Sequence, residues 1–347
     1  MKQLLFFLAL VLLFIGCNKE DEKPLDEKSM YLADTSEIKT VVLEDQNEIF
    51  NLFYNLEKDK EYSYRLTNIA ENTQTIKAND TTLYHKVKQT LTYLINFKVL
   101  DIDVDSIYEV TFNIKSVKLE ADANGEKFYY ESNTSKDSLD KQRYSEYVVV
   151  RNNPFNVRFN KFGELVEIYK ADRIINEFVK LKGVADSIST AEKEFLKKDM
   201  IDRALKPIVV QVFRQFTNKM LSKDSTWTNV QEPSKLMIFQ VNNTNKYKIN
   251  GLELFNDDKI VNINAGLETV ISGNNKFVDR GVTYIFNKPL TNAEGKVYFN
   301  LTKGCIQKSK TQSKIEMSYS MEVQTPNGLE KGSKSEVVFN TNILELL

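Results

Sequence analysis

Hydrophobic and polar residues alternate along several segments of the chain, and the longest such segment runs from Leu83 to Leu100. Its odd-numbered positions are mostly apolar or aromatic, whereas its even-numbered positions are mostly Lys, Thr and Asn. A period of two places successive side chains on opposite faces of a β-strand. At ~3.3 Å per residue this strand would span about 60 Å if it were flat, so we expect it to curl or bulge.

Shorter alternating segments lie on both sides of the middle of the chain. One of them changes phase at Lys115-Ser116, which predicts a β-bulge, and Asn124-Gly125 predicts a hairpin turn. We therefore expect β-rich regions over residues 41–188 and 223–347. The predicted fold is mainly β (α+β), with curled antiparallel sheets that form one or two half-barrels.

The segment between these regions, residues 189–222, has a helical period instead. Ser189 and Glu192 have the spacing of a capping box, and apolar residues recur close to every 3.6 residues from Phe195 to Met220. Pro207 lies inside this pattern and should kink or split the helix. We predict a central amphipathic helical segment packed on a sheet; the alternative is a lid over a cavity, hinged at Pro207.

The N-terminus carries a different kind of signal. A short basic stretch is followed by the apolar run Leu4–Ile15, which as a helix spans only about 18 Å, well short of the roughly 30 Å of bilayer hydrocarbon. Residues 1–16 are therefore expected to be a secretory signal peptide. Phe14-Ile15-Gly16-Cys17 resembles the lipobox of bacterial lipoproteins, which implies cleavage before Cys17 and acylation of its thiol.

Residues 17–40 are expected to form an acidic, polar tether between this anchor and the domain. Within it, Lys19–Glu22 resembles the acidic tag that sends some lipoproteins of double-membraned bacteria to the outer face of the outer membrane. The alternative is that these charges only keep a spacer solvated. We expect a lipid-anchored protein of the outer membrane, and leave open whether it faces the periplasm or the exterior.

Composition restricts the chemistry that the chain can perform. Lys and Arg number 47 against 48 Asp and Glu, a balance that gives no basic surface for nucleic acid. There is one histidine, His85, and once Cys17 carries lipid, Cys305 has no disulfide partner and is expected to be a small buried strand residue. No short catalytic or nucleotide-binding motif is present, although carboxylate pairs would leave none. We expect no enzyme, no catalytic residues, no metal site and no cofactor.

The acidic stretch Asp101-Ile-Asp103-Val-Asp105 begins like a calcium-binding loop. An EF-hand would have Gly at the sixth position and Glu at the twelfth, where this chain has Ser106 and Phe112. Asp also favours turns between strands. A turn is the expected structure, with a weak calcium site as the alternative.

His85 and Gln89 interrupt the apolar face of the Leu83–Leu100 strand, about 13 Å apart along it. Buried polar groups need hydrogen-bond partners, so these side chains lie either at a wet rim or at the mouth of a cavity. In the second interpretation His85 and Gln89 are ligand-binding residues that hold a polar head. The tail of the ligand would then lie against the apolar residues of the same face, Leu91, Tyr93, Phe97 and Val99.

The order of several short motifs resembles a family of bacterial lipoproteins catalogued only as a domain of unknown function. The motifs are Tyr62–Leu66, Phe155–Ile168 followed by a helix, Asp224–Trp227, and Phe299–Gly304. The resemblance covers about Val41 to the C-terminus, and Lys223 stands where the family usually has Gly. The family supplies no catalytic residues that could be assigned to this chain. The overall pattern also resembles open half-barrels that carry lipid or lipoprotein across the periplasm, by analogy of architecture only.

Together these features predict a membrane-anchored lipoprotein of the cell envelope that acts as a non-enzymatic binding module. Its expected partners are a membrane, through lipidated Cys17, and an apolar or lipid-like small molecule. The alternative is a scaffold or assembly protein of the envelope that acts through protein partners. Nucleic acid is not an expected partner.

Overall fold

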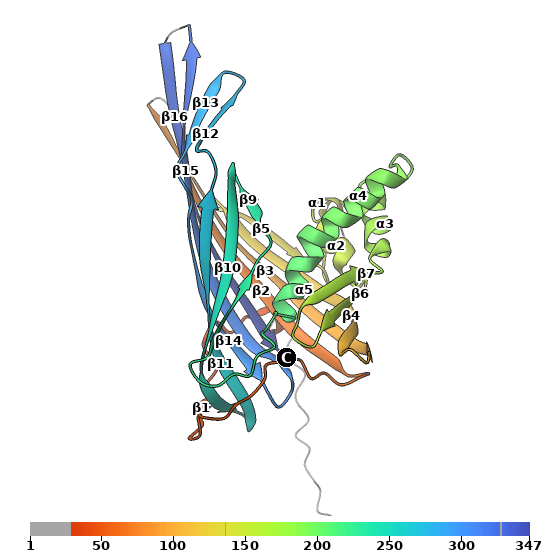
Figure 1. Ribbon diagram of the computed structural model, residues 1–347. Coiled ribbons are helices and arrows are strands. Elements are labelled where there is room, and N and C mark those ends of the chain that lie inside the picture. Colours follow the sequence, from red (N-terminus) through yellow and green to blue (C-terminus); the bar gives the residue numbers. More distant parts are fainter. Residues whose placement is uncertain (1–28, 79, 136, 327) are drawn as a thin grey trace, which may run out of the picture.

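The computed structural model describes residues 29–78, 80–135, 137–326 and 328–347, and Figure 1 shows their arrangement. The expected signal peptide, Cys17 and the acidic stretch Lys19–Glu22 lie outside the described residues.

Long antiparallel strands make up most of the described chain. In the first half these are β1 (Val41–Val42), β2 (Glu61–Ala78), β3 (Thr81–Ile102), β4 (Ile107–Ala123), β5 (Glu126–Glu131), β6 (Phe155–Asn160) and β7 (Leu165–Tyr169). In the second half they are β8 (Thr226–Val230), β9 (Ser234–Leu236), β10 (Phe239–Phe255), β11 (Asp258–Ser272), β12 (Lys276–Asp279), β13 (Val282–Phe286), β14 (Leu290–Asn300), β15 (Cys305–Thr325) and β16 (Gly328–Leu346).

All of these strands belong to one 16-stranded sheet, whose main path across the described residues is β1-β10-β11-β14-β15-β16-β2-β3-β4-β6-β7. The last strand, β16, pairs with β2, so both β-rich regions contribute to the same sheet. The sheet curls around an open interior and its two ends do not pair with each other (Figure 1). The predicted mainly β fold is confirmed, as a single half-barrel.

The strand β3 confirms the long alternating segment and extends it slightly at both ends. Its pairing with β4 shifts between Leu94 and Ile95, opposite the phase change at Lys115-Ser116, which is the expected bulge. Asn124 and Gly125 both have positive φ, 54° and 92°, as the predicted hairpin turn requires.

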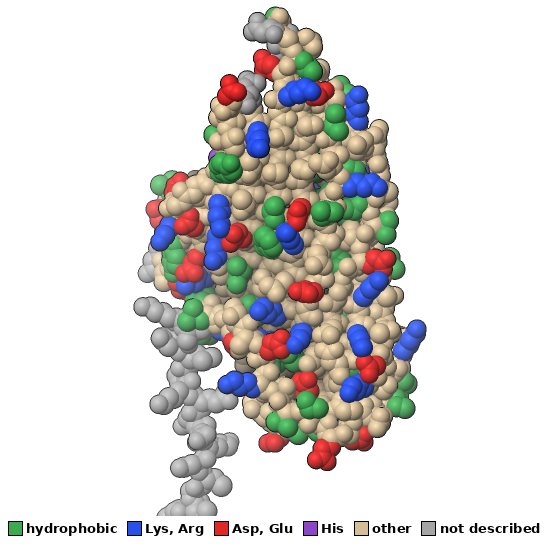
Figure 2. Space-filling model, turned by 90° about the vertical axis from the view of Figure 1, so that its left-hand side faces the viewer, with side chains coloured by type: hydrophobic (Ala, Val, Ile, Leu, Met, Phe, Trp, Pro, Cys, Tyr) green, Lys and Arg blue, Asp and Glu red, His purple; other side chains and the backbone are tan. Residues whose placement is uncertain are grey.

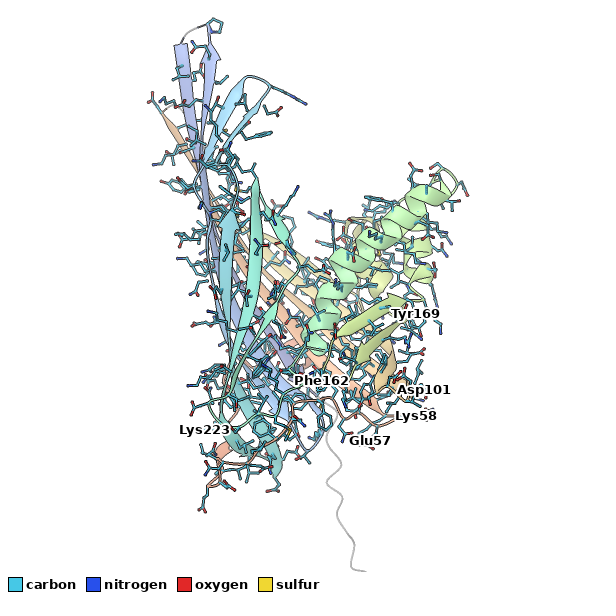
Figure 3. All side chains as sticks on the ribbon, in the orientation of Figure 1. Glu57, Lys58, Asp101, Phe162, Tyr169 and Lys223 are labelled. Carbon is cyan, nitrogen blue, oxygen red and sulfur yellow. The ribbon has the colours of Figure 1, made fainter. Side chains whose placement is uncertain are left out.

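The acidic stretch that begins at Asp101 forms the turn between β3 and β4. Asp103 Oδ1 accepts hydrogen bonds from the backbone N–H groups of Asp105 and Ile107, both at 2.9 Å. Asp101 forms an ion pair with Lys58 at 2.8 Å, and the two side chains lie together in Figure 3. The turn prediction is confirmed, because the carboxylates have local partners that define it.

The helices lie inside and beside the curve of the sheet (Figure 1). They are the short 3₁₀ turn η1 (Ser29–Tyr31), α1 (Ser138–Arg143), α2 (Ser145–Val150), α3 (Asp172–Leu181), α4 (Thr190–Met200), the π-helical turn η2 (Ile201–Leu205) and α5 (Lys206–Val212). The capping box of Ser189 and Glu192 is present at the start of α4. The π turn lies directly before Pro207, where the Lys206 N–H bonds to the Ile201 carbonyl, so the helical path changes type instead of ending.

The predicted helix is wrong in its last turns. It ends at Val212, because Phe213 leaves the helical region with φ −108° and ψ 73°. Phe216 is buried from a loop, and Met220 is exposed. At the other end Phe195 is 74% exposed, since α4 projects beyond the sheet (Figure 1).

Aromatic packing holds α5 and the following residue in the lower part of the half-barrel. The Phe213 ring lies 3.9 Å from the ring of Phe159 and 4.9 Å from that of Phe97, measured between centroids. Tyr54 packs edge-on against Phe213 and donates a hydrogen bond from its hydroxyl to the Val212 carbonyl. These contacts fill the lower interior and fix where the chain emerges from the helix.

Two similar turns, Phe159–Gly163 and Phe299–Gly304, hold the same inner segment. The Tyr54 N–H donates to the Lys161 carbonyl at 2.7 Å, and the next N–H, of Asn55, donates to the Gly304 carbonyl at 3.0 Å. Both glycines have positive φ, 82° and 63°. The two turns therefore bind adjacent residues of one segment, Tyr54 and Asn55.

Cys305, at the start of β15, is 1% exposed, as expected for a small buried strand residue. Burial raises the pKa of its thiol to about 11, which keeps the group protonated at neutral pH.

Candidate functional site

Strand register determines which side chains share the inner face of the half-barrel. Asn342 of β16 pairs with Asn68 of β2 on one side and with Thr311 of β15 on the other. Tyr247 of β10 pairs with Ala265 of β11. Directly paired residues point to the same face of a sheet, so this row forms an inner surface just above the aromatic core.

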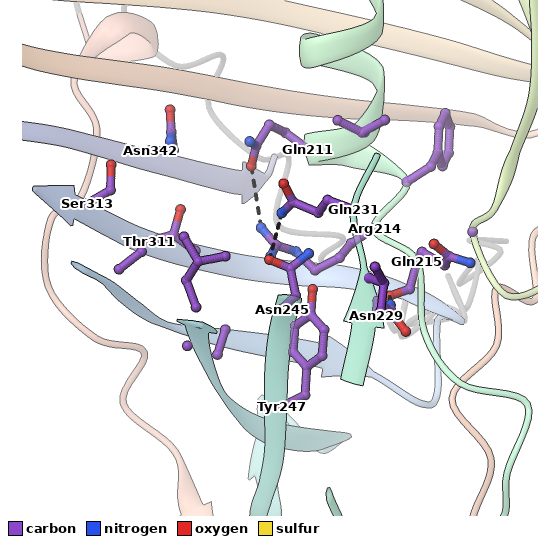
Figure 4. Close-up of a pocket in the computed structure, with 18 of the residues that line it drawn as sticks. Gln211, Arg214, Gln215, Asn229, Gln231, Asn245, Tyr247, Thr311, Ser313 and Asn342 are labelled. Carbon is purple, nitrogen blue, oxygen red and sulfur yellow. Dashed lines mark hydrogen bonds between the residues drawn. The ribbon is translucent and has the colours of Figure 1, made fainter. Parts of the chain in front are cut away.

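A cleft of about 640 Å³ lies between this inner surface and the end of α5 (Figure 4). Its lining includes many amides and hydroxyls: Gln211, Gln215, Asn229, Gln231, Asn245, Thr311, Ser313 and Asn342. The Gln231 amide donates to Asn245 Oδ1 at 2.8 Å, which is one of the dashed lines in Figure 4. Most of these groups face the space, so the cleft offers both hydrogen-bond donors and acceptors.

Arg214 brings a positive charge into this polar cleft (Figure 4). Its Nη2 lies 3.4 Å from Gln211 Oε1, a long hydrogen bond, and its Nε is buried without a hydrogen-bond partner. Within the part of the chain that the structure describes, the guanidinium forms no ion pair. Its backbone carbonyl accepts from the Tyr54 hydroxyl at 3.2 Å, so the core fixes the position of the residue.

Tyr247 lines the cleft, and Trp227 of β8 is its directly paired neighbour. Their rings stack with centroids 4.9 Å apart, and Trp227 Nε1 is buried without a hydrogen-bond partner. The motif that contains Trp227 begins with a turn in which Asp224 has a φ of 65° and pairs with Lys248 at 2.8 Å. The left-handed residue is Asp224 and not Lys223, so the turn forms without Gly at position 223.

Above the cleft the inner face becomes apolar along β15. The alternation that places Thr311 and Ser313 in the cleft continues through the strand. Its inward positions are Ile315, Met317, Tyr319, Met321 and Val323, all partly exposed. A polar cleft therefore leads directly into an apolar wall on the same surface.

The neighbouring inner face of β2 and β16 is polar. Asn68 donates to Asn342 at 2.7 Å, and Asn72 donates to Glu336 at 2.7 Å. Burial alone would raise the pKa of Glu336, but hydrogen bonds from Asn72 and Lys334 outweigh it and leave that pKa below its usual value. The inner surface is thus amphipathic across its width as well as along its length.

The two ligand-binding residues predicted from sequence lie elsewhere on the inner face. His85 is exposed near the end of the β2–β3 hairpin, with Nδ1 3.2 Å from the amide of Asn124. Gln89 is half-buried opposite Ala70 and Ala121. Neither residue lines the cleft, and their proposed role in holding a ligand stays a prediction.

Sequence reasoning missed the amides and Arg214 because they come from a helix end, a loop and strands that are far apart in the chain. The available signal was compositional: Gln211 lies at the end of α5, Arg214 and Gln215 follow it, and Asn242–Asn245 is rich in amides.

The described residues hold no group of three or more His, Cys, Asp or Glu side chains placed to bind a metal ion. Among the same residues no helix has both the length and the apolar character needed to cross a membrane.

The outer face of the sheet carries residues 29–43, which we call the N-terminal strap. Tyr31 donates to Ser116 at 2.9 Å, Asp34 pairs with Lys308 at 3.0 Å, and Thr40 donates to Glu253 at 2.6 Å. Residues 29–40, expected to belong to the tether, therefore lie against the sheet. Elsewhere this side of the molecule mixes basic, acidic and apolar side chains (Figure 2).

A second cavity of about 440 Å³ lies beneath the strap. Lys296, Lys308 and Lys310 line it together with Glu37. Lys296 bonds to Glu37 at 2.7 Å, and Lys310 donates to the Thr35 carbonyl at 2.9 Å. The lysines are thus used to hold the strap.

The fold and the cleft define an open β half-barrel with a ligand-sized space on its inner face. Residues 105–306, more than half of the chain, match a family described as a family of unknown function (DUF6263). The chain belongs to this family. No curated protein matches it.

Several solved structures share a distant likeness. A structure of lipovitellin, concerned with lipid–protein interactions, has 9% identity and a TM-score of 0.40 and covers 84% of this chain. This chain spans only 25% of that protein. An outer membrane channel from Pseudomonas putida F1 has 10% identity and a TM-score of 0.21, covering 85% of this chain and 97% of its own.

OccK2 of Pseudomonas aeruginosa, solved in complex with glucuronate, has 6% identity and a TM-score of 0.19, covering 82% of this chain and 100% of its own. At these scores none of the likenesses bears on function.

Proposed function

We propose that this protein is a non-enzymatic binding module of the cell envelope, anchored to the outer membrane through a lipidated Cys17, whose half-barrel holds an apolar or lipid-like ligand. The observation that carries the proposal is the continuous inner surface from the polar cleft to the apolar wall of β15. A molecule with a polar head and an apolar tail matches such a surface at both ends.

The apolar wall supports this proposal because of where its side chains are exposed. The inward positions of β15, among them Ile315, Met317 and Met321, are partly exposed although they line a concave surface. Apolar side chains gathered in a concavity are typical of ligand sites, whereas isolated ones on a convex surface need no explanation. Methionine in particular adapts to ligands of different shape.

The polar cleft supports the same proposal because one of its buried donors has no hydrogen-bond partner within the protein. Arg214 lines the cleft, and its Nε is buried without a hydrogen-bond partner. Leaving a buried donor unsatisfied costs about 1–3 kcal/mol, which a ligand or water with acceptor atoms would recover. The anchor itself is tested separately by replacing Cys17 with Ser and fractionating cells.

A scaffold role is the second candidate, and the ends of the long hairpins favour it. Leu83, Tyr84, Phe277, Val278 and Leu329 are exposed there. Exposed apolar residues at strand ends can contact partner proteins. In that case protein partners would be recovered reproducibly with the chain, and no small apolar molecule would copurify.

Replacing Met317 with Lys should reduce the amount of bound apolar ligand at least tenfold, because a charged group would enter the apolar wall at a cost of about 1.4 kcal/mol or more. Native mass spectrometry of the purified protein, followed by extraction of the bound molecule, measures the occupancy. Ser320→Lys is the matched control, since position 320 points to the outer face of the same strand. Equal occupancy in both variants and the parent protein would rule out the apolar wall as a binding surface.

A further inference from the structure

We infer that the cleft binds an anionic head group, a phosphate or a carboxylate, on the guanidinium of Arg214. This inference rests on the proposed function and specifies its ligand: an apolar tail that ends in a negative charge. The placement of Arg214 at the junction of the polar cleft and the aromatic core is the starting point (Figure 4).

Charged side chains that are taken out of water are usually paired, and Arg214 is partly buried. Here the guanidinium forms no ion pair with any described residue. Its hydrogen bond to Gln211 is long, at 3.4 Å. Its Nε is buried without a hydrogen-bond partner. A planar fork of N–H donors with unused capacity is the arrangement that binds phosphate or carboxylate oxygens in pairs.

The amides around Arg214 add donors to the same space. Gln211 turns its carbonyl oxygen toward the guanidinium, which leaves its NH₂ group free to face a ligand. Gln231 and Asn245 are bonded to each other at 2.8 Å, which fixes their orientation at the cleft. Fixed donors beside a fixed cation favour an oxyanion, because little side-chain freedom is lost on binding.

The other charged groups of the cleft do not cancel this preference. Lys206 adds a second positive charge to the lining. Glu164 accepts from the amide of Asn160 at 2.9 Å, and Glu294 occupies a register position that points to the outer face, opposite Gln312. Glu232 is exposed at the rim. Among these charged groups, Arg214 is the one that bonds to an amide of the cleft lining, that of Gln211.

Three compounds with the same twelve-carbon tail distinguish the contribution of the head group to binding from that of the tail. They are dodecyl phosphate, dodecanoate and dodecanol. Titration calorimetry of the full chain, with Cys17→Ser to keep it out of membranes, should show at least tenfold tighter binding of one or both anions than of dodecanol. The tighter of the two anions identifies the head group as phosphate or carboxylate. Raising the ionic strength should weaken the binding of the two anions and leave the binding of dodecanol unchanged.

Arg214→Gln should remove the tighter binding of the anions. Their affinity should fall about tenfold or more, while the affinity for dodecanol should stay within twofold of that of the parent protein. Arg214→Lys keeps the charge without the fork and should retain part of the affinity. Lys219→Gln makes the same change of charge at an exposed position outside the cleft and should leave the affinity for all three compounds unchanged.

Equal binding of all three compounds, unaffected at Arg214, would overturn the anion inference while the binding function stands. Failure of every compound to bind the parent protein would overturn the proposed function, and the anion inference with it.

Discussion

Gly163→Ala is expected to destabilise the protein by about 3 kcal/mol or more, the sum of a positive-φ penalty and a clash with backbone that cannot move cheaply. A Cβ added at Gly163 would clash with the carbonyl oxygen of Arg214 and would lie 2.8 Å from the ring of Tyr54. Both are held by the core, so relief would require the turn and the cleft to shift. Equilibrium denaturation with urea measures the loss.

Gly125→Ala is the matched control for this substitution. Gly125 also has a positive φ, 92°, but a Cβ there would meet nothing within 4 Å. Its cost should be about 1 kcal/mol, the conformational penalty alone. If the two variants lose equal stability, the close approach between the Phe159–Gly163 turn and Arg214 is not a feature of the folded protein.

Phe213→Ala should cost about 3–5 kcal/mol, the usual range for deleting a buried aromatic ring. The side chain is 2% exposed and packs against Phe97, Phe112 and Phe159. Thermal and chemical denaturation report the loss.

Phe195→Ala is the corresponding control in the same helical segment, because that ring is 74% exposed on α4. The free energy of unfolding should change by no more than about 0.5 kcal/mol, as for surface substitutions in general. A large loss at Phe195 together with a small loss at Phe213 would show that the helix packs through a different face.

The strand pattern was readable from sequence because it depends on neighbours in the chain. The alternation of β3, the bulge opposite Ile95 and the turn at Asn124-Gly125 all follow from local sequence. The capping box of Ser189 likewise needs only three residues. The end of the helix was not readable, because Phe216 continues the apolar period but is buried from a loop that reaches the core.

The candidate cleft depends on contacts between distant segments. Arg214 lies just beyond a helix end, and its position is set by Tyr54 and Gly163, more than fifty residues away in each case. The sequence shows that Met317 and Thr311 share a face of one strand, but not that this face lies opposite the end of α5. The N-terminal strap was missed for the same reason, since the polar composition of residues 29–40 is also that of a tether.

The central claim is that the inner face of the half-barrel holds an apolar ligand, and photocrosslinking in the cells that make the protein tests it most directly. A benzophenone amino acid placed at position 317 lies on the inner face, and at position 320 it lies on the outer face of the same strand. The account predicts a small-molecule adduct at position 317, detected by intact mass, and none at position 320. An unmodified position 317, or adducts at position 320 alone, would contradict it.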